Sequence, residues 1–197
     1  YWYSTCQAFV TWRRSIYMII GLAGYARSGK DTVAQILVDN YKFKRVAFAD
    51  KVREFVYALD LPMDPSFDES VTTKTVVNVN GWEKAKNFKT IRKTLQDVGL
   101  AAREVFGPDF WVKQAMREIS PEDNIVITDV RFPNEAEMVK KLNGQIWRVI
   151  RPGISAVNSH ISENALDNYE FDFDVYNDST LTDLAMDVDI LMEDLSV

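Results

Sequence analysis

The chain has 197 residues, 47% of them hydrophobic and 26% charged, a balance typical of one globular domain with a full apolar core. Its formal net charge of −6 argues against broad binding to nucleic acid or to acidic membranes. Cys6 and His160 are the single cysteine and histidine, which excludes an internal disulfide and a multi-histidine zinc site and suits a reducing cytoplasm.

Residues 1–17 precede Met18, where the first predicted strand begins. They include paired arginines, and an apolar run from Met18 and small residues near Gly24 follow, a pattern that a signal peptide also has. That run is far too short to span a membrane, and cleavage near its end would destroy the glycine-rich loop that follows. We therefore interpret residues 1–17 as an upstream extension or an artificially added segment, with Met18 as the natural start and one domain over residues 18–197.

A glycine-rich loop lies between a strand predicted at 18–23 and a helix predicted at 31–39, and it reads Gly24-Tyr25-Ala26-Arg27-Ser28-Gly29-Lys30-Asp31-Thr32. Strand, loop and helix in this order indicate a phosphate-binding loop. Gly24 and Gly29 let successive N–H groups point at phosphate oxygens, and Lys30 can reach the outer phosphates. We expect nucleotide phosphates to be bound by Gly24, Arg27, Ser28, Gly29, Lys30, Asp31 and Thr32. The alternative is an ordinary strand-to-helix turn with an exposed lysine.

Asp31 departs from the usual form of this motif. Normally Ser or Thr follows the lysine and serves as a magnesium ligand. Here an acid occupies that position and the hydroxyl comes one residue later, at Thr32.

A second short strand is predicted at 44–49 and a helix at 51–59, with Asp50 between them. An acid at the carboxyl end of a strand in an α/β sheet lies where ligands bind, so Asp50 is a candidate substrate contact. The alternative is that Asp50 caps the helix, and the two roles can coexist. Residues 60–89 are polar and rich in turn residues, which predicts a functional loop or a short hairpin.

A helix with a regular apolar face is predicted over 91–105 and ends before Gly107-Pro108. Arg92 and Gln96 are one turn apart on it and can present a joint donor face to a ligand, although exposed Arg and Gln are most often solvated surface. Asp109 begins a further helix, in which we expect Trp111 in the core rather than stacked on a base.

An apolar strand predicted at 124–128 ends in Asp129, as expected for an acid that orients magnesium-bound water in a phosphate-loop enzyme. Arg131 follows in the loop at the same strand end, and we favour a phosphate contact over a salt bridge to Asp129. Asn134 and Glu137 predict a capping box for a helix at 135–143.

The last third of the chain is predicted to hold strands at 146–150 and 173–176 and a terminal helix capped by Thr180. Between the two strands we predict a mobile lid at 151–163, with Arg148 and Arg151 at its root and His160 and Glu163 within it. Strands that alternate with helices predict an α/β fold with a five-stranded parallel sheet covered on both faces. The site is expected at the carboxyl ends of the strands.

A phosphate loop alone does not distinguish a kinase from a GTPase or a motor. The guanine-reading Asn-Lys-x-Asp sequence is absent, and the chain shows no second domain to be moved. A single domain with an inserted segment after the second strand and an arginine-bearing segment after the fourth favours a small-molecule kinase.

Several blocks over residues 18–195 resemble, in the same order, the deoxynucleoside monophosphate kinases of bacteriophages. The most specific are the phosphate loop with Asp31 after the lysine and the run Thr128-Asp129-Val130-Arg131-Phe132-Pro133-Asn134-Glu135. Looser blocks are Phe48-Ala49-Asp50-Lys51, Leu95-Gln96-Asp97-Val98-Gly99, Phe106-Gly107-Pro108-Asp109-Phe110-Trp111-Val112 and His160-x-Ser162-Glu163. By this resemblance Asp31 is a family variant rather than a defect.

The resemblance implies a P-loop NTPase three-layer α/β/α fold similar to adenylate kinase, with an acceptor-binding part at about 60–106 and a lid at about 151–163. It also implies ATP with Mg²⁺ as the donor and a deoxynucleoside monophosphate (dNMP) as the acceptor. Some members form homodimers. A phage source would place the protein in the host cytoplasm.

The resemblance further implies roles for the candidate residues. Lys30 and the loop would hold the donor phosphates, while Asp31 and Asp129 would orient Mg²⁺ through water. The acceptor phosphate and the transferring group would be steadied by Arg92, Arg131 and one of Arg148 or Arg151. Asp50 and Gln96 would contact the sugar or base of the acceptor. The expected catalytic set is Lys30, Asp31, Asp129 and Arg131.

Two alternatives remain open from the sequence. One is a kinase with a hydroxyl acceptor, such as a dephospho-coenzyme A kinase or a nucleoside kinase, in which Asp50 would act as the base. The other is a nucleotide-binding regulatory module without turnover. The regulatory module is disfavoured by the presence of Lys30, the two strand-end acids and the arginines.

Overall fold

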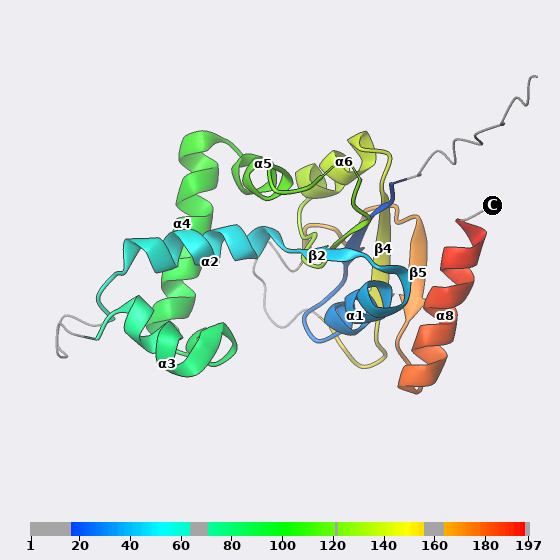
Figure 1. Cartoon of the computed structure of the whole chain (residues 1–197), viewed down its shortest axis with the longest axis horizontal. Helices are drawn as coiled ribbons and strands as arrows, with labels where there is room; N and C mark the ends of the chain where they lie inside the picture. Colours follow the sequence, from blue (N-terminus) through cyan, green and yellow to red (C-terminus); the bar gives the residue numbers. More distant parts are fainter. Residues whose placement is uncertain (1–16, 64–70, 121, 156–163, 196–197) are drawn as a thin grey trace, which may run out of the picture.

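Five parallel strands form one sheet in the computed structural model, which describes residues 17–63, 71–120, 122–155 and 164–195 (Figure 1). The strands are β1 (Ile19–Ala23), β2 (Lys44–Val46), β3 (Ile125–Ile127), β4 (Gln145–Ile150) and β5 (Phe173–Tyr176), in the spatial order β2-β3-β1-β4-β5. Strands β2 and β3 lie on one side of β1, and the later strands β4 and β5 lie on its other side. The carboxyl ends of β3, β1 and β4 therefore flank the point at which α/β sheets bind ligands.

Helices α1 (Lys30–Tyr41) and α8 (Leu181–Asp194) cover one face of the sheet (Figure 1). The core on this face is apolar and fully buried, and it includes Ile20, Leu22, Val33, Leu37, Trp147, Val175, Leu184 and Val188. Thr180 caps α8 as predicted, because its Oγ1 accepts a hydrogen bond of 3.2 Å from the Asp183 N–H. These contacts hold the helix that follows the phosphate loop in place.

The other face is covered by α5 (Phe110–Met116) and α6 (Pro133–Lys141). Its core includes Val112, Ala115, Ile125, Ile127, Ala136, Val139 and Ile146. Two helical layers around a parallel sheet confirm the predicted three-layer α/β/α architecture. Within the described ranges, none of the helices combines the length and apolarity that a membrane crossing requires.

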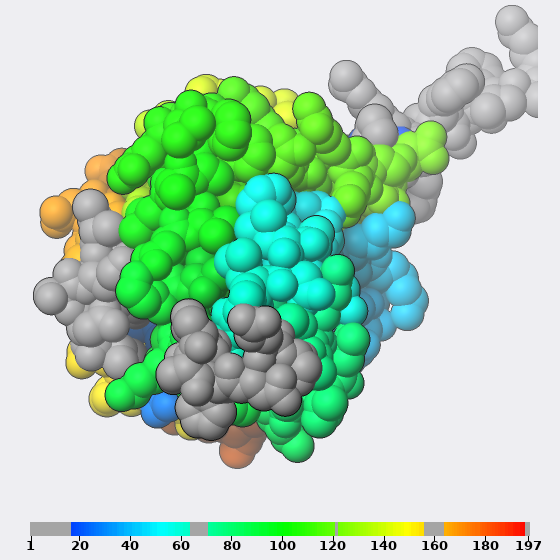
Figure 2. Space-filling model, turned by 90° about the vertical axis from the view of Figure 1, so that its left-hand side faces the viewer, coloured from blue at the N-terminus to red at the C-terminus, as the bar shows by residue number. Residues whose placement is uncertain are grey.

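Three helices stand beside the sheet rather than on it: α2 (Phe48–Leu59), α3 (Thr73–Ala85) and α4 (Lys89–Phe106). Figure 2 shows them side by side on one face of the molecule, coloured from cyan to green. They have a small core of their own, made of Val76, Val77, Ala85 and Ile91. The part predicted at 60–106 to bind an acceptor is therefore mostly helical.

Helix α3 corrects the prediction of a loop or hairpin over 60–89. Its start is capped by Thr72, whose Oγ1 accepts a hydrogen bond of 3.3 Å from the Thr75 N–H. Gly81 breaks the helical geometry with φ 70° and ψ 161°, and this kink interrupts the periodicity that would have revealed the helix. The only extended pairing here is an isolated bridge between Pro62 and Thr72, among the residues described.

The start of α2 corrects a second prediction. The strand expected at 44–49 ends at Val46, and Phe48 and Ala49 belong to the helix. Both oxygens of Asp129 accept hydrogen bonds of 2.8 Å, one from the Phe48 N–H and one from the Ala49 N–H. Asp129 thus caps α2 from a distant loop, and Asp50, for which capping the helix was the alternative role, lies inside its first turn.

Candidate active site

The loop between β1 and α1 has the backbone of a phosphate cradle. Gly24, Arg27 and Gly29 have φ values of 131°, 68° and 109°, in the left-handed region that turns the chain sharply. A Cβ atom at Gly24 would lie 2.4 Å from the carbonyl oxygen of Val149 in β4, so only glycine fits against that strand. Three left-handed residues within one short loop give it the curvature that lets N–H groups converge on an anion.

The side chain of Lys30 folds back onto the start of this loop. Its Nζ donates hydrogen bonds to the carbonyl oxygens of Gly24, at 2.8 Å, and Tyr25, at 2.7 Å. The ammonium group is therefore at the loop itself. Asp31 and Thr32 follow in the first turn of α1, the acid exposed and the hydroxyl residue half-buried.

Ser28 and Arg27, also predicted to bind phosphate, take opposite positions in the loop. Arg27 is exposed, whereas Ser28 is only 1% exposed. Its Oγ has no hydrogen-bond partner among the described residues. Ser28 therefore lies beneath the loop surface, and its backbone N–H donates a hydrogen bond of 3.2 Å to the carbonyl oxygen of Tyr25.

Asn177 is a site residue that the sequence did not reveal. It follows β5, and its Nδ2 donates a hydrogen bond of 2.9 Å to the carbonyl oxygen of Ser28. Its backbone N–H donates one of 2.7 Å to Ile150, at the end of β4. The signal that could have found it is its position just after a parallel strand, at the same sheet edge as the loop.

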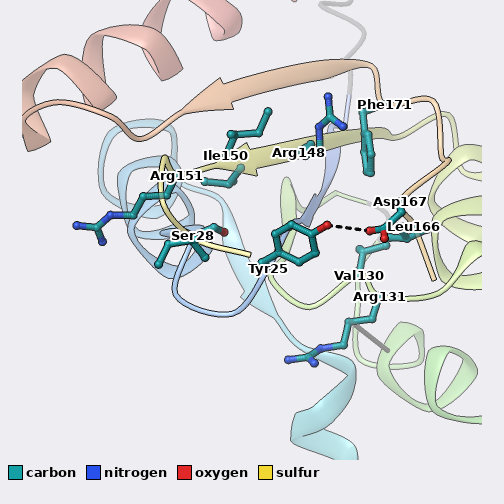
Figure 3. A pocket seen from close by; sticks show the side chains of 13 residues that line it. Tyr25, Ser28, Val130, Arg131, Arg148, Ile150, Arg151, Leu166, Asp167 and Phe171 are labelled. Carbon is teal, nitrogen blue, oxygen red and sulfur yellow. Dashed lines mark hydrogen bonds between the residues drawn. The ribbon is translucent and has the colours of Figure 1, made fainter. Parts of the chain in front are cut away.

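A cavity of about 250 Å³ opens beside the phosphate loop. It is lined by the loop, the carboxyl end of β4, the segment after β3 and residues 164–171; the lining residues include Gly24, Tyr25, Ser28, Val130, Arg131, Arg148, Arg151, Leu166, Asp167 and Phe171. Figure 3 shows Tyr25 pointing at Asp167, to which its hydroxyl donates a hydrogen bond of 3.1 Å. Both residues belong to the cavity lining. We refer to this cavity as the loop cavity.

Arg148 and Arg151, expected at the root of a lid, both line the loop cavity. Arg148 is held in a two-fold hydrogen bond to Asp174 on β5, with distances of 2.7 Å and 2.5 Å. Its guanidinium lies 4.9 Å from the centre of the Phe171 ring. Figure 3 draws both side chains among those that line the cavity. The bond to Asp174 raises the pKa of Arg148 further. Arg151 is exposed, whereas His160 and Glu163 lie outside the described residues.

A second cavity, of about 270 Å³, lies between α2, α4 and the segment after β3. Its apolar walls include Phe48, Val52, Leu95, Leu100, Trp111 and Phe132. Its polar lining includes Arg53, Lys86, Gln96, Arg103, Asp129, Arg131 and Glu135. We refer to it as the helical cavity. Trp111 is 6% exposed and therefore belongs to the core, as predicted, and its Nε1 is fixed by a hydrogen bond of 3.0 Å to Gly99.

The predicted acceptor contacts are only partly brought together. Gln96 and Arg131 line the helical cavity. Asp50 instead forms ion pairs with Arg45, at 3.0 Å, and Arg53, at 2.9 Å, and lines a groove near β2. Arg92 is exposed and its Nε donates to the carbonyl oxygen of Lys86 at 3.3 Å.

Asp129 combines a structural contact with a place in the helical cavity. Desolvation raises the pKa of its carboxyl, against the two backbone N–H groups and the nearby Arg131, which lower it. The acid is half-buried, so part of its surface faces the cavity. Its position after β3 is the one predicted.

Glu135 and Arg103 are further site residues, to which the sequence assigned no role of their own. Glu135 is 5% exposed and accepts hydrogen bonds from the backbone N–H groups of Arg131, at 2.8 Å, and Phe132, at 3.1 Å. It corrects the capping box predicted from Asn134 and Glu137, because Glu135 receives the N–H groups that precede α6. Burial raises the pKa of Glu135 to about 7.

Magnesium has chemically suitable donors at the phosphate loop. No group of three His, Cys, Asp or Glu side chains comes together in the part of the chain that the structure describes. Mg²⁺ commonly uses one or two carboxylates and keeps its other positions for water and substrate phosphates. The exposed Asp31 supplies such an oxygen at the phosphate loop, so the loop fits the ion, whereas Asp129 lines the helical cavity and both of its oxygens accept N–H groups of α2.

Comparison with known proteins gives a family match. The sequence model of deoxynucleotide monophosphate kinase matches residues 62–188. An Acanthamoeba polyphaga mimivirus protein named "Putative deoxynucleotide monophosphate kinase" is 31% identical over 180 residues, which cover 83% of this chain and 90% of that protein. An uncharacterized protein of Ictalurid herpesvirus 1 is 37% identical over 98 residues, 46% of this chain and 42% of that protein. Neither relative is from a bacteriophage, so these matches do not extend to the expected phage source.

Solved structures resemble the fold at low sequence identity. A dephospho-CoA kinase from Campylobacter jejuni is 13% identical with a TM-score of 0.47, and covers 90% of this chain and 96% of that one. Shikimate kinase from Aquifex aeolicus is 14% identical with a TM-score of 0.44, and covers 91% and 99%.

Proposed function

The chain belongs to the deoxynucleotide monophosphate kinase family, and from this membership we propose that it transfers the γ-phosphoryl group of ATP to a dNMP, giving ADP and a deoxynucleoside diphosphate. Membership makes the protein a phosphotransferase. The choice of ATP as donor and of a dNMP as acceptor is the proposal. The bases that are accepted are left to experiment.

The observation that carries the proposal is the position of Arg131, which lines both the loop cavity and the helical cavity. A transfer between two nucleotides needs two binding regions that meet at the transferring group. Arg131 is exposed at that border and follows the strand next to β1. A guanidinium there can contact the donor and acceptor phosphates together.

The residues at the phosphate loop fit the donor. Lys30 and the backbone N–H groups of the loop would bind the outer phosphates, and the start of α1 would add the positive end of its dipole. When bound, Mg²⁺ would neutralise charge on these phosphates, held by Asp31 and Asp129 through water. Arg148 and Arg151 line the same cavity, and one of them would add positive charge around the transferring group; Arg148 is already paired with Asp174, and Arg151 is exposed.

The helical cavity fits the acceptor. Its apolar walls, which include the half-buried Phe132 and the exposed Leu100, can receive a base, and the Gln96 amide can both donate and accept hydrogen bonds. The acceptor is already a phosphate monoester with anionic oxygens, so it needs positioning and charge neutralisation rather than a strong base. Asp50 and Arg92 remain proposed acceptor contacts that would have to reorient to reach this cavity.

Asp50 also bears on the alternative of a hydroxyl acceptor. A base must approach the hydroxyl proton within hydrogen-bond distance. Asp50 is instead engaged by two arginines and lines a different groove, which does not favour that role. If Asp50→Asn loses kcat while substrate binding stays intact, hydroxyl attack is supported; a loss mainly in acceptor affinity supports a dNMP.

By resemblance alone, we further propose that the protein acts in the cytoplasm and that two copies can form a homodimer. Sedimentation of the purified protein would test the dimer.

The proposal is tested with purified protein, MgATP and each of the four common dNMPs, with ADP formation followed over time. We expect ADP and the corresponding diphosphate in stoichiometric amounts, and only slow ADP formation without acceptor. Lys30→Ala should lower kcat by about a hundredfold, because a charge at the transferring phosphates is removed. Absence of ADP with every dNMP, or faster turnover of nucleosides or dephospho-coenzyme A, would contradict the proposal.

A further inference from the structure

Glu135 holds the backbone of the segment that carries Arg131. The carboxylate lies at the start of α6 and is almost fully buried. Its Oε2 accepts hydrogen bonds from the N–H groups of Arg131, at 2.8 Å, and Phe132, at 3.1 Å. Because one oxygen accepts from two adjacent N–H groups, it fixes the direction of the backbone after β3. The position of the Arg131 Cα atom, from which the side chain extends, is fixed with it.

The other oxygen of Glu135 receives Arg103 from α4. The Oε1–Nη1 distance is 3.2 Å, and the second Arg103 terminal nitrogen donates to the Asn134 side-chain oxygen at 3.3 Å. The guanidinium plane also lies 4.2 Å from the centre of the Phe132 ring. Arg103 therefore contacts three side chains of the same segment, using both its planar face and its hydrogen-bonding fork.

The pair connects the two walls of the helical cavity. Gln96 precedes Arg103 by about two turns on α4, so both residues face the same side of that helix. Glu135 belongs to the wall that carries Arg131. The Arg103–Glu135 contact thereby sets the separation between the side chains predicted to bind the acceptor and the arginine shared by both cavities.

We propose that Glu135 and Arg103 are a positioning pair that orients Arg131 toward the acceptor, an inference that rests on the proposed dNMP kinase activity. Neither residue needs to touch the transferring phosphate for this role. Buried ion pairs contribute little net stability, because desolvation offsets the attraction between the charges. A geometric role at the cavity accounts for an ion pair between a buried carboxylate and a half-buried guanidinium, which a stability argument alone would not favour.

Glu135→Gln tests the pair selectively. The amide oxygen can still accept from the Arg131 and Phe132 N–H groups, but the amide NH₂ would face the Arg103 guanidinium and cannot accept from it. We expect kcat/KM for the dNMP to fall by about ten- to a hundredfold, with KM for ATP changed less than about twofold. Arg103→Lys should have a similar effect, and the double variant should be little worse than either single one.

Lys140→Met is a matched control, because it removes another ion pair of α6, to Asp172 at 2.6 Å, away from both cavities. It should leave both kinetic constants unchanged. If Glu135→Gln and Arg103→Lys only lower the melting temperature, or change the constants for ATP and dNMP equally, the positioning role is overturned. If the wild-type protein phosphorylates no dNMP, the proposed function fails first and the pair's role falls with it.

Discussion

The side-chain amide of Asn177 donates a hydrogen bond of 2.9 Å to the carbonyl oxygen of Ser28, and so joins the end of β5 to the phosphate loop across 149 positions of sequence. The same nitrogen occupies the space beside Gly29, where an added Cβ would lie 2.3 Å from it. Asn177 is itself anchored by its N–H to Ile150. The shape of the phosphate loop therefore depends on a residue far from the loop motif.

Asn177→Ala should weaken donor binding specifically. Loss of one hydrogen bond to the loop costs about 1 kcal/mol, which corresponds to a rise of about five- to tenfold in KM for ATP if the loop shape is what is lost. KM for the dNMP should stay unchanged. Steady-state kinetics with each substrate varied in turn measures both. Asn40→Ala, at the exposed end of α1, is the control, and an effect confined to the dNMP would contradict the expectation.

Gly24→Ala separates backbone strain from a direct clash. At this position φ is 131° and the new Cβ would lie 2.4 Å from a backbone oxygen of β4, which cannot move aside. Gly81→Ala shares a positive φ, 70°, but has open space around it. We expect Gly81→Ala to lower the free energy of unfolding by about 1–2 kcal/mol with KM for ATP unchanged. Gly24→Ala should cost more and abolish ATP binding by calorimetry; equal effects would be inconsistent with the clash.

The sheet and the phosphate loop could be predicted because their signals are local. Short runs of strand length located all five strands, although β2 itself is the mostly exposed Lys44–Val46, and the glycine spacing located the loop. The boundary between β2 and α2 was wrong because Asp129 caps α2 from 80 positions away. A local sequence pattern cannot indicate a helix cap that is supplied by a residue distant in the sequence. Phe48 and Ala49 were therefore assigned to the strand.

The acceptor side was harder to predict for a related reason. Helix α3 was missed because Gly81 kinks it, and the packing of α3 decides which sides of α2 and α4 face inward. Gln96 lines the helical cavity and Arg92 does not, although both were predicted from their spacing alone. The Arg103–Glu135 contact depends on how α4 packs beside α6, which no local periodicity determines.

Asp129→Asn distinguishes a helix cap from a magnesium contact. The carboxylate accepts two N–H groups of α2, so its replacement should lower the free energy of unfolding by about 1–2 kcal/mol even in EDTA. If it also orients magnesium-bound water, the Mg²⁺ concentration for half-maximal rate should rise. Asp123→Asn, which removes an ion pair to Lys44 before the same strand, is the control. A change in stability alone would leave Asp129 with only the capping role.

Asp31→Ser tests the role of the unusual acid that follows the lysine of the phosphate loop. Asp31 is exposed in the first turn of α1, and a hydroxyl there is the ordinary magnesium ligand of such loops. We therefore expect Asp31→Ser to keep kcat within about tenfold of wild type and Asp31→Ala to lose more. Asp39→Ser, near the other end of α1, should change nothing. A collapse of transfer by Asp31→Ser with ATP binding intact would instead place Asp31 on the acceptor or the transferring phosphate.

Glu135 predicts an unusual dependence of stability on pH. Burial and the nearby Asp129 raise its pKa from 4.5 to about 7, against the opposing effects of Arg103 and the backbone N–H groups of Arg131 and Phe132. Between these two values the folded protein binds more protons at Glu135 than the unfolded chain does. Its contribution to the free energy of unfolding therefore falls as pH rises from 4.5 to about 7, by up to about 3 kcal/mol, and is constant above that.

Urea unfolding of wild type and Glu135→Gln at pH 5, 6, 7 and 8 measures this effect. The difference in unfolding free energy between the two proteins should change in favour of Glu135→Gln as pH rises to 7, and then level off. Groups such as Asp60, Asp183 and Glu83, whose pKa values are lowered by their hydrogen bonds, contribute equally to both proteins and cancel in the difference. A difference that stays flat from pH 5 to 8 would mean that Glu135 is ionised throughout, with Arg103 compensating its burial.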